Sequence, residues 1–271
     1  MKIAVSNIAW PAESDADAYA TLKAHGISAL EVAPSRRWPH WKGIDAASIA
    51  EYRETLSNEG LSVSSLQAIL FQQPDLRLFG TDADRAALDQ HLRFCADLAV
   101  GLGASCAVFG APKNRDKGAL TLDEAFDIAI PFFASIGGYF AARGVFIGFE
   151  ANPVDYGCNF GTHARDAARL VRAVNSPGFR LHLDTACMHL AGEAAAGLIT
   201  ENADILGHFH ASQPHLGTFA DPLASHQAAT EALSAIDYKG WCVLEMRAAD
   251  PPIPALDQAV SHLRSTYGDR S

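Results

Sequence analysis

The sequence has few basic residues and no long hydrophobic run. Its 271 residues include 21 lysines and arginines against 31 aspartates and glutamates, which gives a formal net charge of -10. Such a chain repels a phosphate backbone unless a local basic patch overrides the overall field, so we expect no nucleic-acid partner. No window approaches the ~18 uninterrupted apolar residues of a membrane span, so we expect no membrane partner either.

Cysteine is also scarce, and it is scattered through apolar runs. The cysteines are Cys95, Cys106, Cys158, Cys187 and Cys242. Their number is odd and they form no close CxxC pair, which indicates reduced thiols. The first residues, MKIAVSNIAW, lack the apolar core and cleavage site of a secretion signal. We therefore expect a soluble cytoplasmic protein.

No Gly/Ser linker, low-complexity segment or composition break divides the chain, so we expect residues 1–271 to form one domain. Short β-branched or apolar runs alternate with longer segments whose apolar residues recur at spacings of three and four. The runs that we predict to be strands cover residues 2–7, 29–34, 62–69, 105–110, 145–151, 179–185, 206–212 and 241–247. Eight βα units in about this length favour the α/β class and a single (β/α)8 TIM barrel.

Four consecutive predicted strands finish with a residue that can bind a metal. The motifs GFEANP, LHLDTA, GHFHAS and VLEMR hold these residues, which are Glu150, Asp184, His210 and Glu245. Chemistry in such barrels lies at the carboxyl ends of the strands, and alternate strand residues share a face, so all four should point into the barrel. Three carboxylates this close repel one another in a low dielectric, and a divalent cation relieves that cost.

The donor set indicates which ion to expect. Three carboxylates and one imidazole form a mostly oxygen set, which favours Mn²⁺, with Mg²⁺, Co²⁺ or Zn²⁺ as alternatives. His182 and His208 lie one inward layer below Asp184 and His210. We expect these two histidines to support the ligands from below. The alternative is that each acid is separately ion-paired inside the barrel.

In this order the four motifs resemble the xylose isomerase-like TIM barrels, a superfamily that holds sugar isomerases and epimerases, inosose dehydratase and endonuclease IV. The resemblance extends over essentially the whole chain. It implies that the four residues bind one divalent ion and that Glu150 and Glu245 also form the acid/base pair. Moving a proton at a carbon beside a carbonyl needs that pair and a positive charge on the oxygen that becomes an enolate. We therefore expect a metal-dependent isomerase or epimerase of a small-molecule sugar or sugar derivative, acting through a metal-stabilised enediolate.

The chain departs from the family at two positions. Many members have a histidine three residues after the strand-six aspartate, and ketose epimerases have an arginine six residues after the strand-seven histidine. Here these residues are Cys187 and Leu216, which argues against ketohexose 3-epimerase activity. The additional histidines of endonuclease IV are missing as well. A dehydratase of the inosose type and a non-catalytic sugar- or metal-binding component stay open, and since relatives are often dimers or tetramers, so does a homo-oligomer.

Further polar residues are candidates for substrate binding. Asn7, Glu31 and Gln67 end the first three predicted strands, where they could bind sugar hydroxyls or instead brace a loop or a metal ligand. The other substrate-binding candidates follow later strands: Lys113, Asn152 and Arg247.

Some loop residues after the strands allow two interpretations each. Lys113, Asn114 and Arg115, together with Arg247, would suit a phosphate or carboxylate, or else form a solvated basic surface. Three tryptophans follow the first two strands and could close over a sugar or pack in the core: Trp10, Trp38 and Trp41.

Overall fold

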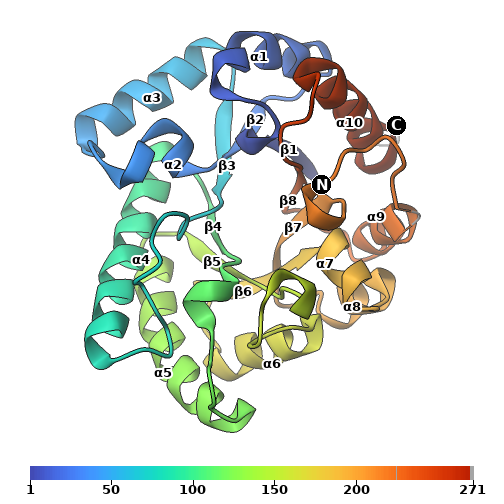
Figure 1. Ribbon diagram of the computed structural model, residues 1–271. Coiled ribbons are helices and arrows are strands. Elements are labelled where there is room, and N and C mark those ends of the chain that lie inside the picture. Colours follow the sequence, from blue (N-terminus) through green and yellow to red (C-terminus); the bar gives the residue numbers. More distant parts are fainter. Residues whose placement is uncertain (224, 269–271) are drawn as a thin grey trace.

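The computed structural model describes residues 1–223 and 225–268 and contains a closed barrel of eight parallel strands (Figure 1). Neighbours in the barrel are neighbours in the chain, and the last strand pairs with the first. The strands are β1 (Lys2–Ser6), β2 (Ala29–Val32), β3 (Ser62–Leu66), β4 (Cys106–Phe109), β5 (Phe146–Glu150), β6 (Phe179–Asp184), β7 (Leu206–Ser212) and β8 (Trp241–Glu245). The predicted (β/α)8 barrel is confirmed, and every strand lies within its predicted range.

Helices surround the barrel and connect its strands. They are α1 (Asp15–Ala24), α2 (Pro34–Arg37), α3 (Ala46–Asn58), α4 (Asp82–Leu102), α5 (Leu122–Ala141), α6 (Ala164–Val174), α7 (Thr185–Leu190), α8 (Ala195–Glu201), α9 (Ser225–Ala235) and α10 (Pro252–Tyr267). Local sequence sets their ends. The side chain of Thr81 accepts a hydrogen bond from the Asp84 amide at the start of α4, and Gly103 ends this helix at a φ of 80°, a conformation that favours glycine.

Alternation along the strands separates a hydrophobic outer face from the barrel interior. Phe149 of β5 points outward, where its ring centroid lies 5.6 Å from that of Phe133 on α5. Inside the barrel, Ala4, Ala29 and Val243 form a small cluster of their own. Val243 precedes Glu245 by two residues on β8, so small apolar residues lie beneath the polar mouth on the side of β8, β1 and β2.

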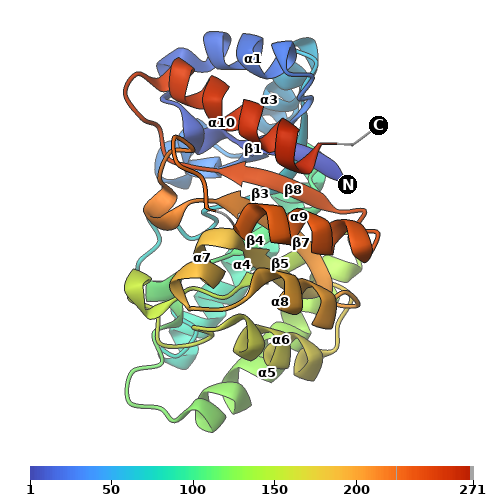
Figure 2. The same ribbon diagram turned by 90° about the vertical axis from the view of Figure 1, so that its right-hand side faces the viewer.

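The loops that follow the strands gather at one end of the barrel, which faces the viewer in Figure 1 and lies on the left in Figure 2. The N-terminus lies at the opposite end (Figure 2). Trp10 and Trp38 are only 1% and 4% exposed, so these two tryptophans pack in the core. Trp41 is half-buried and donates its indole N–H to the carbonyl of Phe71 at 2.8 Å. Among the described residues, none of the helices is both long and apolar enough to span a membrane.

Candidate active site

The ends of β5, β6 and β7 place three of the four expected metal ligands together. Glu150, Asp184 and His210, joined by His182, each offer a ligand atom, and these four atoms lie within 4.8 Å of one another. The fourth expected ligand, Glu245, lies beside this group, with its Oε2 3.3 Å from His210 Nδ1. Glu245 is the most open of the expected ligands, with 13% of its side chain exposed.

Hydrogen bonds fix the Asp184 carboxylate. Its Oδ1 accepts from the backbone N–H of Cys187 at 2.7 Å, because Asp184 caps the first turn of α7. Its Oδ2 accepts from the hydroxyl of Ser212 at 2.6 Å. The carboxylate therefore has one defined orientation toward the barrel axis.

The Glu150 carboxylate fits into a space that only a glycine leaves free. A Cβ on Gly110, which follows β4, would lie 1.9 Å from Glu150 Oε2. The same oxygen accepts a hydrogen bond from Asn152 Nδ2 at 2.8 Å. Gly110 and Asn152 together set the position of this carboxylate.

His210 has one engaged ring nitrogen and one free one. Its Nε2 donates to Glu31 Oε2 at 3.1 Å, and Ser65 donates to the same oxygen at 2.8 Å. Its Nδ1 has no hydrogen-bond partner, although Asp184 Oδ2 lies 3.8 Å away and Glu245 also faces it. Nδ1 faces two carboxylates without a hydrogen bond to either, and a divalent ion bound between the three groups would replace the proton on Nδ1 and satisfy them all.

The electrostatics of the site favour a cation. Burial raises the pKa values of Glu150 and Asp184, and it raises the pKa of Glu245 to about 7; the positive charge of His210 only partly offsets this. Burial alone would lower the pKa of His210, but Glu31 and Glu245 raise it well above its usual range. Buried carboxylates that resist ionisation are the environment that a divalent ion stabilises.

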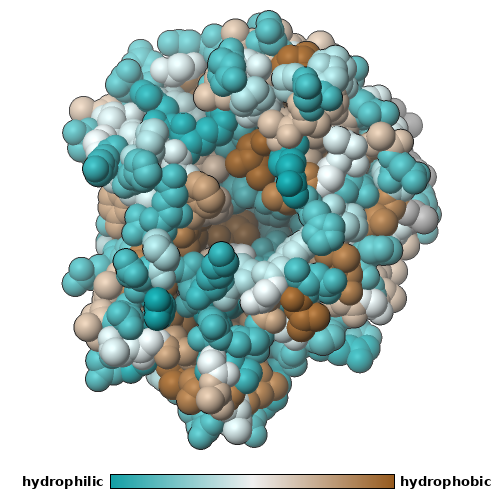
Figure 3. Space-filling view, in the orientation of Figure 1, coloured by the Kyte–Doolittle hydropathy of each residue, from teal (hydrophilic) through white to brown (hydrophobic). Residues whose placement is uncertain are grey.

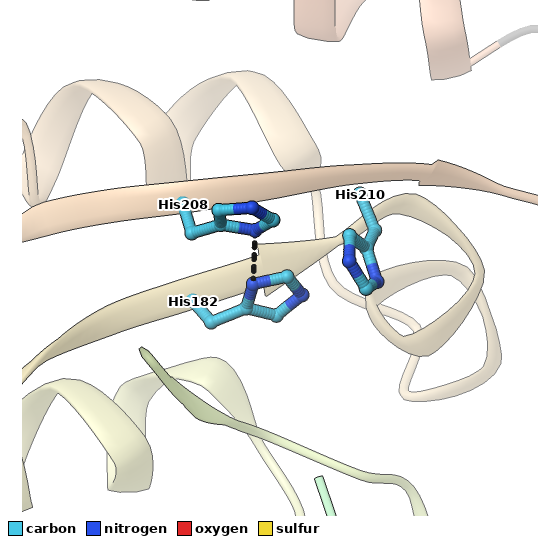
Figure 4. Close-up of side chains that lie close together, drawn as sticks. All are labelled: His182, His208 and His210. Carbon is cyan, nitrogen blue, oxygen red and sulfur yellow. Dashed lines mark hydrogen bonds between the residues drawn. The ribbon is translucent and has the colours of Figure 1, made fainter. Parts of the chain in front are cut away.

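His182 and His208 lie side by side on β6 and β7, next to His210 (Figure 4). Their Nδ1 atoms are 3.1 Å apart, and burial lowers both pKa values well below the usual range, so both rings are neutral. His208 Nε2 lies 3.6 Å from Glu31 Oε2, the oxygen that also accepts from His210. His182 Nε2 lies 3.3 Å from Glu150 Oε1, which puts His182 within reach of an ion as well as in a supporting position.

Glu150 and Glu245, the expected acid/base pair, line a cavity of about 610 Å³ at the barrel mouth. Its lining includes Glu150, His210 and Glu245, and two of the substrate-binding candidates, Gln67 and Lys113. This volume is typical of a small-molecule site. The hollow is visible in the centre of Figure 3.

The remaining substrate-binding candidates do not line this cavity. Asn7 is buried and accepts from the Ala33 amide at 2.9 Å, so it braces the loop after β2. Asn152 is buried behind Glu150, and Glu31 is buried under His210; of the two roles left open for Glu31, this placement favours bracing a ligand. Arg247 is exposed, and its guanidinium donates to the carbonyl of His215.

Lys113 and Asn114 of the loop after β4 both line the cavity, but the side chain of Asn114 is engaged by the neighbouring loop. Asn114 is buried and donates to the carbonyl of Gln73 at 2.7 Å. Arg115 is also buried, with its guanidinium 4.8 Å from the ring centroid of Phe149, on the outer side of the barrel. Neither of these two side chains is placed to bind an anionic substrate.

Sequence reasoning missed several residues of the site. Ser212 follows His210 by two residues on the same face of β7, so the alternation that identified His210 would also have identified the partner of Asp184. Tyr156 and the loop 68–74 line the cavity from outside the strands. No periodicity fixes the direction of loop side chains, so these residues had no comparable signal.

The fold and the grouped residues define the class of protein. The family model described as xylose isomerase-like TIM barrel matches residues 19–266, so the chain belongs to this family, as its four strand-end motifs suggested. The L-ribulose 3-epimerase of Methylomonas sp. (strain DH-1) is 22% identical over 262 residues, which cover 96% of this chain and 88% of that protein.

Two solved structures show the same architecture. D-psicose 3-epimerase from Clostridium cellulolyticum H10, solved with D-tagatose, has a TM-score of 0.82 at 15% identity and is matched over 99% of this chain and 100% of its own. The 3-keto-D-glucoside 4-epimerase from E. coli has a TM-score of 0.79 at 19% identity, over 98% and 99%. Identities this low establish the fold, while the named activities belong to those proteins.

Proposed function

We propose that the protein is a metal-dependent isomerase or epimerase of a sugar or sugar derivative. The observation that carries this proposal is the free Nδ1 of His210, which faces the carboxylates of Asp184 and Glu245 at the edge of a small-molecule cavity. The family and its sugar-epimerase relatives support the same conclusion.

In this proposal Glu150, Asp184, His210 and Glu245 hold one divalent ion. Oxygen donors predominate, which favours Mn²⁺. The free Nδ1 of His210 and the grouping of Glu150, Asp184 and His210 within 4.8 Å are features that fit such an ion. When bound, the ion supplies positive charge beside the carbonyl oxygen of the substrate.

Glu150 and Glu245 carry the proton transfers. Glu150 ends β5 and Glu245 ends β8, and β6 and β7 lie between these two strands in the barrel. Both carboxylates line the cavity. One carboxylate removes the proton from the substrate carbon beside the carbonyl, and the other carboxyl returns a proton to the opposite face of the same carbon. The configuration of that carbon is inverted and the mass is unchanged.

The Glu150→Gln and Glu245→Gln variants test this assignment. Each should lower kcat at least about 100-fold, because a general acid/base contributes about 10²–10⁴-fold. The measurement is deuterium incorporation from D₂O into ketoses, aldoses and uronates. The wild type is measured before and after EDTA treatment. The control variant is Glu54→Gln, at an exposed residue of α3. Unchanged rates in both variants, or no EDTA-sensitive exchange on any of these sugars, would contradict the proposal.

A lyase of the inosose dehydratase type is the second candidate, since after one glutamate removes the proton the other carboxyl could protonate a β-hydroxyl, which would leave as water. Cys187 and Leu216 stand at positions where ketose epimerases have residues that contact the substrate. This difference from the ketose epimerases is the reason to test for a lyase. Product mass separates the two, because dehydration loses one water and epimerisation loses none.

A further inference from the structure

One wall of the cavity is hydrophobic. It belongs to the loop between β3 and α4 and to the end of β4, and its apolar members include Ile69, Phe71, Pro74, Val108, Ala111 and Pro112. Phe71 is 58% exposed, one of only a few large hydrophobic side chains that the described residues leave open to solvent. Hydrophobic residues along the hollow are visible in Figure 3.

This wall is held rigidly by its neighbours. Trp41 donates to the carbonyl of Phe71 at 2.8 Å, and Asn114 donates to the carbonyl of Gln73 at 2.7 Å. His91 Nε2 contacts the carbonyl of Ile69 at 2.7 Å. The ring of Phe71 is therefore exposed on a loop that is fixed by three side chains from other segments.

The same contacts engage main-chain acceptors of the loop, namely the carbonyls of Ile69, Phe71 and Gln73. Gln72 and Gln73 also line the cavity, and Gln72 Oε1 accepts from the backbone N–H of His40. Sugar hydroxyls placed against the apolar side chains of this wall would lose water without gaining partners. An apolar group placed there would instead remove both its own surface and the Phe71 ring from water.

We propose that the substrate is a sugar derivative that carries an apolar substituent, and that this substituent packs on Phe71. The sugar part lies against Glu150, His210 and Glu245, which line the other side of the same cavity. The sugar half of this assignment rests on the proposed function, whereas the apolar half rests on the wall alone. An aromatic substituent fits best, since the exposed ring of Phe71 can stack with it.

Two glycosides that differ only in the substituent test the proposal. Methyl and phenyl β-D-glucopyranoside are titrated into the Mn²⁺-loaded protein by calorimetry. The wild type should bind the phenyl glycoside about ten-fold more tightly than the methyl glycoside, from burial of apolar surface. In Phe71→Ser the preference should fall to about two-fold or less. Val100→Ser, at an exposed apolar residue of α4, is the matched control and should keep the full preference.

Equal binding of the two glycosides by the wild type, no binding of the phenyl glycoside, or a preference that survives in Phe71→Ser would each overturn the proposal. So would loss of the preference in Val100→Ser. The assay measures binding and not turnover, so it separates the two proposals. A Phe71-dependent preference in a protein whose glutamate variants lose no activity would leave the apolar subsite standing and remove the epimerase assignment.

Discussion

At the residue scale, one hydrogen bond decides which nitrogen of His210 faces the cavity. Glu31 accepts from Nε2, and so Nδ1 is the nitrogen on the side of Asp184 and Glu245, where loss of its proton would present a lone pair to an ion. Burial alone would raise the pKa of Glu31, but the charge of His210 and its hydrogen bond outweigh burial and lower it. Glu31 is therefore ionised and holds the ring in the orientation that a metal ligand needs.

Replacing Glu31 tests this role. Glu31→Gln keeps the shape of the side chain but removes its charge, so the His210 ring becomes less basic and less firmly oriented. We expect Mn²⁺ to bind about 10- to 100-fold more weakly, as when the partner of a ligating histidine is changed. Calorimetric titration of Mn²⁺ measures the affinity, with Glu54→Gln as the control. An unchanged affinity for Mn²⁺ would show that Glu31 does not orient His210.

At the element scale, the end of β4 makes room for a side chain of β5. The two strands are paired in register, with Phe109 opposite Phe149, and the next residue on each is Gly110 and Glu150. A Cβ at Gly110 would collide with the end of the Glu150 side chain, which is flexible enough to move away. The missing Cβ therefore matters for the position of the carboxylate more than for the stability of the strands.

Gly110→Ala should accordingly separate activity from stability. Displacement of Glu150 by about 1 Å is expected to lower kcat/KM roughly 100-fold, because misplaced catalytic groups lose rate steeply. The melting temperature should change little. Gly138→Ala, at a helical glycine of α5 whose Cβ would meet nothing within 4 Å, is the control and should leave kcat/KM unchanged. Full activity in Gly110→Ala would mean that Glu150 needs no such space.

The docking of α9 provides an acid-sensitive contact away from the metal site. His226 Nε2 lies 2.7 Å from Gln213 Nε2, and Gln213 Oε1 accepts from the Leu223 amide, which fixes the amide with its NH₂ toward the ring. His226 Nδ1 contacts the Tyr267 hydroxyl at 2.7 Å. Burial, with a smaller effect from His262, lowers the pKa of His226 to about 4.

This low pKa predicts the sign of a pH effect. Between about pH 6.5 and pH 4 the unfolded chain binds a proton at His226 and the folded protein does not, so stability falls as pH falls, by up to roughly 3 kcal/mol for this group. His226→Gln should lose less stability than wild type over this range in urea unfolding. The exposed His163→Gln is the control and should behave as wild type. Parallel losses in wild type and His226→Gln would contradict the assignment.

At the scale of the whole molecule, the barrel brings carboxylates together at a cost in stability. Metal binding should offset that cost, and at a free Mn²⁺ concentration about 100 times Kd the gain is roughly 3 kcal/mol. We expect the melting temperature to rise by several degrees with Mn²⁺ and to return with EDTA. Asp184→Asn should abolish this rise, while the metal-free variant should be at least as stable as metal-free wild type, since burial disfavours the charge. A metal-induced rise that persists in Asp184→Asn would contradict this ligand set.

The sequence by itself determined the barrel and the common face of the residues at the ends of β5 to β8. Both follow from local periodicities: eight alternating units predict the barrel, and the two-residue alternation of a strand places Asp184 and His210 inward. These properties depend on neighbours in the chain. The barrel and the inward face of these residues could therefore be predicted without knowledge of the tertiary contacts.

Only the tertiary structure decided what each inward residue contacts. Glu31 meets His210 across 179 positions of the chain because the barrel closes, and its side chain lies buried under a ligand. The loop that presents Phe71 is fixed by Trp41, His91 and Asn114, each from a different segment. Burial, shifted pKa values and the choice of partner arise from packing between residues far apart in sequence, and no local pattern encodes them.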